Sequence, residues 1–291
     1  MKKKTILSLL LLLCCTLVTQ AQIERNVVYP CLRGNIIYTP PKAQKESTAK
    51  TVGKIIGSVL QASAGTAENT TDLPQYADAV CEAIVGAVGQ ARRINMTDDA
   101  TSGEALCLDA SVSAISASSH IKTWTDKDGK NHEKTEYRGN ITGTINIKTA
   151  DTGRILYTKT INSGAWADAW FEAADKAVGY AISRMKQSIT ESINNAFPLY
   201  ASIVEGARDK KDKTKEVYID LGEAHGCTRG IHFTVYTVRT VAGKEAKKKI
   251  GQLRVTEVMG DEVSLCKVLR GGQDIKTALD AGETLLITSN D

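Results

Sequence analysis

The feature that most constrains the fold is a repeated pattern of short β-type segments and glycines from Leu199 onward. Four β-type segments follow one another there, each carrying glycine, and they read EVYIDLGEAHG, CTRGIHFTVYTVRT, KIGQLRVTEVMGDEVSLCKVL and ALDAGETLLITS. Two stretches, TRGIHFTVY and DAGETLLIT, share a pattern in which a glycine turn leads into a short strand. Short strands joined by glycine turns are typical of small antiparallel barrels and sandwiches. The sequence therefore predicts a small antiparallel β-barrel domain over residues 199–291.

The preceding part of the chain combines helices and strands. Apolar residues recur at helical spacing over residues 52–60, over residues 76–91 and in a long segment from Trp166 to Ala196. The first of these helices either docks on its own domain or touches a membrane over residues 50–65. Between the second and third helices lie long alternating segments that predict paired strands.

Two turns are predicted between these strands. Asp128 and Gly129 are expected to supply a pair of positive φ angles at the first turn. The second turn lies in KTADTGRI, where Gly153 takes the positive φ and Asp151 bonds the turn amides. We therefore expect an α+β domain over residues 22–198, a sheet backed by helices, followed by the barrel.

The N-terminus has the form of a secretory signal peptide. Three lysines precede an apolar run, and small residues before position 22 predict cleavage after Ala21. Removal of residues 1–21 takes away three lysines and no acid, so the formal charge falls from +4 to +1. That balance gives no global case for nucleic acid or for an anionic membrane as a partner. No small residue precedes Cys14 in the way that lipidation requires, so the exported chain is expected to be periplasmic or associated with the outer membrane, and not lipidated.

Five cysteines remain after cleavage, and they are scattered. They are Cys31, Cys81, Cys107, Cys227 and Cys266, with no CxxC pair among them. Zinc binding is therefore not expected. Cys227 and Cys266 form a candidate disulfide within the C-terminal part, and Cys81 is expected to be a buried thiol.

Asp151-Thr152-Gly153 is the triplet in which aspartic proteases carry a catalytic carboxylate. Such catalysis needs two carboxylates that share one proton, and no second copy of the triplet occurs in the chain. Arg154 follows directly, and its cation would keep Asp151 ionised. The triplet is therefore interpreted as a turn.

Other candidate chemistry is weaker. His225, Cys227 and His232 cluster in the sequence but match no standard metal or nucleophile spacing. Trp166 and Trp170, one helical turn apart, either stack on a sugar or belong to the core, and the core interpretation is favoured. No catalytic residue, cofactor site or metal site is predicted.

The order of elements resembles exported proteins related to the curli-secretion channel CsgG and the periplasmic flagellar protein FlgT. The residues that carry this resemblance are ADAVCEAIVGAVGQARRINMTDD, INIKTADTGRILYTKTI, WFEAADKAVGYAISRMKQSITESINNAFP and the glycine-punctuated C-terminal strands. The resemblance covers residues 75–290. It implies an α/β domain with a sheet backed by helices, then a barrel, and a role in envelope assembly or secretion through protein contacts.

Several functions remain open from the sequence. The leading hypothesis is a non-enzymatic periplasmic protein that binds other envelope proteins, either as a single chain or as a homo-oligomer. A second is an activator of peptidoglycan synthesis, because small proteins of that kind look similar over the α/β domain. A third is a hydrolase or glycan-binding module that uses Asp151 or the Trp166/Trp170 pair. The charged residues across 118–142 argue against a hairpin that inserts in a membrane, since charges on a lipid-facing strand are costly.

Overall fold

The computed structural model describes residues 26–30, 36–38, 69–96, 106–163, 169–241 and 243–290. The chain divides into two compact units, Val27–Ile193 and a unit that contains Asn194–Asp291, and each is described by itself. The predicted signal peptide, the predicted helix of residues 50–65 and Trp166 lie outside the described residues.

The first unit is built on one sheet around the long strand β5. Three short strands pair in succession along one edge of β5: β1 and β2 are parallel to it and β3 is antiparallel. β6 runs antiparallel along the other edge, and β7 pairs with β6. The elements are β1 (Asn26–Pro30), β2 (Ile36–Tyr38), β3 (Asn69–Asp72), η2 (Pro74–Tyr76), α3 (Ala77–Gly89), β4 (Ile94–Met96), β5 (Leu106–Thr125), β6 (Asn131–Thr149), β7 (Ile155–Asn162) and α4 (Ala174–Ala196).

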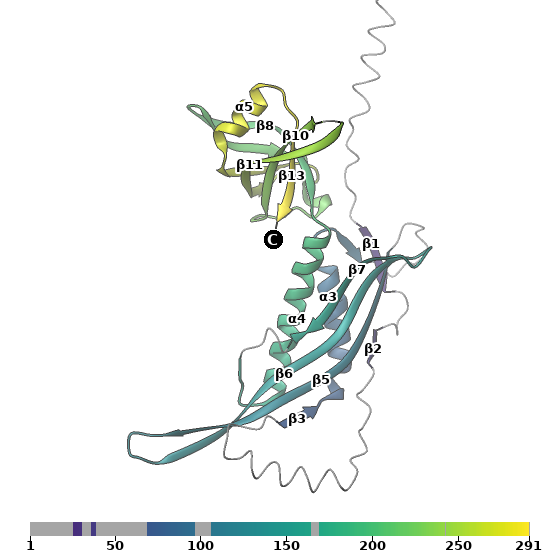
Figure 1. Cartoon of the computed structure of the whole chain (residues 1–291), viewed down its shortest axis with the longest axis vertical. Coiled ribbons are helices and arrows are strands. Elements are labelled where there is room, and N and C mark those ends of the chain that lie inside the picture. Colours follow the sequence, from purple (N-terminus) through teal and green to yellow (C-terminus); the bar gives the residue numbers. More distant parts are fainter. Residues whose placement is uncertain are drawn as a thin grey trace, which may run out of the picture. The chain divides into compact units, whose positions relative to one another are not determined.

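Alternation along β6 explains why helices cover one face of this sheet. Ile141, Ile145 and Ile147 are fully buried, whereas the threonine and asparagine residues between them are only half-buried. Successive side chains of a strand point to opposite faces, so the isoleucines form one apolar face. α3 and α4 lie side by side over the sheet (Figure 1), and Thr190 of α4 donates a hydrogen bond to the Ala87 carbonyl of α3 at 2.8 Å.

Gly139 of β6 marks the closest approach between the sheet and α4. A Cβ at this position would lie 2.4 Å from the carbonyl oxygen of Ala177 and 2.9 Å from Cα of Val178. Both helix residues are fully buried. The backbone of α4 therefore rests directly on β6 at a place where only glycine fits.

The predicted start of the long helix at Trp166 is wrong. α4 begins at Ala174, because the chain just before it is used by the sheet. Phe171 exchanges two backbone hydrogen bonds with Tyr137 of β6, at 2.7 and 2.8 Å. Residues that hydrogen-bond to a strand edge cannot also be helical, so the tryptophan at position 170 lies outside α4.

The second unit is a closed antiparallel barrel of six strands in the order β10-β11-β12-β9-β8-β13. Its glycine turns are used as the sequence predicts: Gly230 has φ of +96° before β10, and Gly282 has φ of +69° before β13. The elements are β8 (Tyr200–Lys210), β9 (Lys213–Ile219), η4 (Glu223–His225), β10 (His232–Val241), β11 (Lys244–Val258), β12 (Ser264–Arg270), α5 (Gly272–Asp280) and β13 (Leu285–Asn290).

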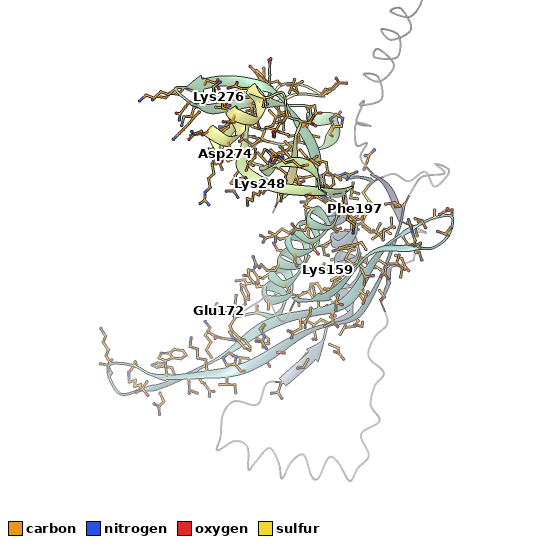
Figure 2. The ribbon with its side chains drawn as sticks, turned by 45° about the horizontal axis from the view of Figure 1, so that its top comes forward. Lys159, Glu172, Phe197, Lys248, Asp274 and Lys276 are labelled. Carbon is orange, nitrogen blue, oxygen red and sulfur yellow. The ribbon has the colours of Figure 1, made fainter. Side chains whose placement is uncertain are left out.

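The short helix α5 contributes to the barrel core. Ile275 is fully buried and Ala278 nearly so, and both belong to the cluster of apolar residues inside the barrel. Lys276, on the outer side of α5 (Figure 2), donates hydrogen bonds to Asp209 of β8 at 2.7 Å and to Asp280 at 3.2 Å. The sequence did not predict this helix.

The described chain is therefore mostly β-structure with few helices, and a closed six-stranded antiparallel barrel accompanies a separate sheet. Among the described helices, none has both the length and the apolar character required to cross a membrane.

Candidate interaction surface

The first unit carries a two-stranded ribbon, which we define as residues 120–136. β5 and β6 remain paired out to Thr125 and Asn131, well beyond the last partner of β5 on its other edge, at Ser119. Figure 1 shows the two strands continuing past the ends of α3 and α4. In the described structure, no third strand pairs with residues 120–136. Both edges of the ribbon therefore present backbone N–H and C=O groups that another chain can reach.

A tight turn at Asp126 closes the ribbon. The Gly129 amide donates to the Asp126 carbonyl at 3.1 Å, and the Asp126 side chain accepts from the amides of Asp128 and Lys130, both at 2.9 Å. Gly129 has φ of +75°. Among the described residues the only non-glycine with positive φ is Lys211, so the expectation that Asp128 shares this conformation is wrong. The Asp126 carboxylate, by accepting from the amides on both sides of Gly129, stabilises a turn in which Gly129 alone has a positive φ.

Trp124 is the largest exposed side chain of the ribbon, with 45% of its surface accessible. Its ring stacks on that of His132, directly across the two strands, with ring centroids 5.3 Å apart and an interplanar angle of 18°. Nε2 of His132 lies 2.7 Å from a carboxylate oxygen of Asp126. That hydrogen bond is the main cause that lowers the pKa of Asp126 below its ordinary value, together with the Lys130 and Asp128 amides. The indole thus stacks on a ring that is itself bonded to the turn.

A shallow hollow lies around this pair of rings. It has a volume of about 470 Å³ and is lined by Thr123, Trp124, Thr125, Asn131, His132 and Glu133. An amphipathic aromatic surrounded by hydroxyl, amide and carboxylate groups is the composition of an interface hot spot with its polar rim. The sequence did not single out Trp124. Its exposure depends on how far the two strands run beyond their other partners, and the sequence gives no local signal of that length.

Charges along the ribbon are balanced and partly paired. Residues 120–136 carry four lysines and four carboxylates, a formal charge of zero. Glu136 lies 3.9 Å from Nζ of Lys122 and 3.7 Å from Nζ of Lys134, which also donates to Glu172 at 2.7 Å. Figure 2 shows Glu172 in the segment that joins the sheet to α4. Mixed charges on open edges discourage indiscriminate strand pairing, so the ribbon is suited to a specific partner.

Trp170 braces the ribbon where it leaves the sheet. Its ring meets that of His120 edge-on, with centroids 3.9 Å apart, and the Arg138 guanidinium lies 5.0 Å from its ring centroid. The indole is half-buried between these two side chains. The structure therefore places Trp170 in packing contacts of the first unit, and its predicted partner for sugar stacking, Trp166, is outside the described residues.

Asp151 and Gly153 lie in the turn between β6 and β7. Gly153 has φ of +65°, and its amide donates to the Thr149 carbonyl at 3.0 Å. Asp151 accepts from the Thr152 amide at 2.7 Å, which is the main cause that lowers its pKa. The carboxylate is fully exposed and is engaged by its own turn, so nothing in this geometry prepares it to share a proton.

The sequence cluster in the barrel is dispersed by the fold. His225 is buried, and its Nδ1 accepts from the Gly222 amide at 3.4 Å, whereas His232 is exposed at the start of β10. Across the described ranges, no group of three or more potential metal ligands comes together.

Cys227 and Cys266 lie inside the barrel as two buried thiols. The Ser264 hydroxyl donates to Sγ of Cys227 at 3.4 Å. Burial is the main cause that raises the pKa of the Cys266 thiol to about 12, and the nearby Cys227 adds to the effect. The disulfide that the sequence suggested between them is therefore not formed in this structure. Cys107 of β5 is disulfide-bonded, and Cys81 is a half-buried thiol whose pKa is raised by burial and by Asp78.

Comparison of the chain with models of known protein families found no match, and comparison with curated proteins found no significant similarity.

Proposed function

We propose that this chain is an exported, non-enzymatic protein of the cell envelope that works in assembly or secretion by binding other proteins, and that the ribbon is its binding surface. The observation that carries the proposal is Trp124: a large aromatic side chain, nearly half exposed and stacked on His132, on a two-stranded ribbon that no third described strand covers. Tryptophan is strongly enriched among the few residues that supply most of the binding energy at protein interfaces.

The architecture supports the same proposal. A sheet covered on one face by α3 and α4, followed by a small closed barrel, is the arrangement that the resemblance to CsgG- and FlgT-like proteins implies. We therefore propose that the first unit corresponds to the α/β domain of that family. The signal-peptide pattern supports export to the periplasm or the outer membrane.

The candidate catalytic groups favour binding over catalysis. Asp151 belongs to an exposed turn, and Trp170 is packed against Arg138 and His120. Among the contacts of the described residues, neither is paired with a second group that catalysis would require.

Capture from crosslinked envelopes tests the proposal. The wild-type mature chain is expected to recover a specific envelope protein or a second copy of itself, and Trp124→Ala is expected to lose that partner. Ile155→Ala is the matched control, because Ile155 is 58% exposed on the same unit but lies outside the ribbon. Recovery of a peptidoglycan synthase that the purified chain stimulates would favour the activator hypothesis. Equal recovery by wild type and Trp124→Ala would show that the ribbon is not the binding surface.

A further inference from the structure

A second surface, on the barrel, carries an unbalanced positive charge. Residues 236–249, the paired ends of β10 and β11, contain Arg239, Lys244, Lys247, Lys248 and Lys249 against one carboxylate, a formal charge of +4. The rest of the segment 194–291 has ten basic and thirteen acidic side chains, a formal charge of −3. The positive charge of this unit is therefore concentrated on one structure, which we call the basic arm.

The basic arm extends beyond the closed part of the barrel. β13 pairs with β10 from His232 to Thr237, whereas β10 and β11 remain paired with each other as far as Val241 and Lys244. Residues 238–247 thus form a hairpin in which, among the described strands, β10 and β11 pair only with each other. All four lysines are exposed.

The carboxylates that the structure describes leave these lysines without an ion pair. The ion pair on the arm joins Arg239 to Glu283 at 3.4 Å. Among the described residues, no ion pair includes any of the four lysines. By contrast, Lys276 on the same barrel lies between two carboxylates. Exposed cations gathered on one hairpin repel one another, and an excess charge of +4 at that place attracts an anionic ligand.

We propose that the basic arm binds the anionic lipid headgroups of a membrane surface. The chain is expected to be exported, where it meets membranes and not nucleic acid. Lysine is a compact, strongly hydrated point charge that attracts an anionic surface without demanding the fixed geometry of a bidentate partner. Val238 is 37% exposed and lies directly opposite Lys247, so the arm also offers apolar surface beside its charges. This inference goes beyond the proposed binding of proteins through the ribbon and does not depend on it.

Sedimentation with vesicles tests the proposal. The full mature chain is mixed with vesicles of phosphatidylcholine alone or of phosphatidylcholine with phosphatidylglycerol, at low and at physiological salt. The arm variant is Lys247→Gln/Lys248→Gln/Lys249→Gln. The matched control, Lys210→Gln/Lys211→Gln/Lys213→Gln, removes the same charge from the β8–β9 hairpin of the same barrel.

Wild type is expected to bind only the vesicles with phosphatidylglycerol and to lose binding as salt rises. The arm variant is expected to bind roughly a hundredfold more weakly, about fivefold for each lysine, whereas the control loses less than about tenfold. Thermal unfolding of both variants should match wild type, since the replaced side chains are exposed. Equal losses in the two variants would overturn the proposal, because vesicle binding would then depend on the net charge of the protein and not on the position of the lysines. Absence of vesicle binding at low salt, or crosslinks from the arm lysines to an acidic protein in place of lipid binding, would also overturn it.

Discussion

Replacement of Gly139 by alanine reveals whether α4 rests on the sheet as described. The added Cβ would lie 2.4 Å from the Ala177 carbonyl oxygen and 2.7 Å from its carbonyl carbon, both backbone atoms of α4. A side chain could rotate away, but a helix backbone has to move as a body. Ordinary van der Waals contact therefore requires α4 to shift by about 1 Å from β6.

The cost of that shift has two opposing parts. Overpacking of a well-filled core costs typically 1–3 kcal/mol, and here the shift separates the fully buried Val178 and Met185 from the sheet. Glycine in a strand is itself unfavourable by roughly 0.5–1 kcal/mol, which alanine recovers. The difference leaves Gly139→Ala destabilising the first unit by about 1 kcal/mol, equivalent to roughly 2–4 °C in the melting temperature.

Thermal and urea unfolding of the mature chain measure this effect. Gly179→Ala is the control, because a Cβ there meets nothing within 4 Å and alanine favours the helix. That variant is expected to stabilise α4 by up to about 1 kcal/mol. The reasoning is refuted if Gly139→Ala stabilises the protein as Gly179→Ala does.

Three further predictions concern single side chains. Ile275→Ala is expected to lower the free energy of unfolding of the barrel by about 2–5 kcal/mol, because it removes a fully buried side chain from the core, and urea unfolding measures the change. Burial raises the Cys266 pKa from 9.0 to about 12, so its contribution to stability is complete below pH 9 and is lost between about pH 9 and 12. Cys266→Val should flatten the dependence of the unfolding free energy on pH in that range. An unchanged dependence would contradict the burial of the Cys266 thiol. His132→Ala is expected to raise the pKa of Asp126, which carboxylate NMR titration would detect; an unshifted titration would show that the two side chains are not bonded in solution.

Patterns that repeat along the chain predicted much of this fold. Alternation of Ile141, Ile145 and Ile147 with polar residues predicts a strand with one buried face, and glycine turns before β10 and β13 predict the short strands of the barrel. These features are local, so hydrophobic periodicity and turn chemistry are sufficient to find them.

Features that depend on tertiary contacts could not be predicted from local sequence patterns. Trp170 falls at helical spacing with the stripe of α4, but backbone pairing between Phe171 and Tyr137 overrides that local pattern. α5 spans nine residues, and its apolar positions Ile275 and Ala278 are too few for a periodic signal. The exposure of Trp124 follows from how far β5 and β6 run beyond the helices, which no local pattern encodes.

The most direct test of the central claim is photo-crosslinking from the ribbon itself. A benzophenone amino acid is placed at Thr123, beside Trp124, and in a second chain at Thr158, an exposed residue of β7 outside the ribbon. We expect a discrete crosslinked protein from position 123 in intact envelopes, and its loss when Trp124→Ala is added. No crosslink from position 123, or the same products from positions 123 and 158, would contradict the claim that this chain works by binding a protein through its ribbon.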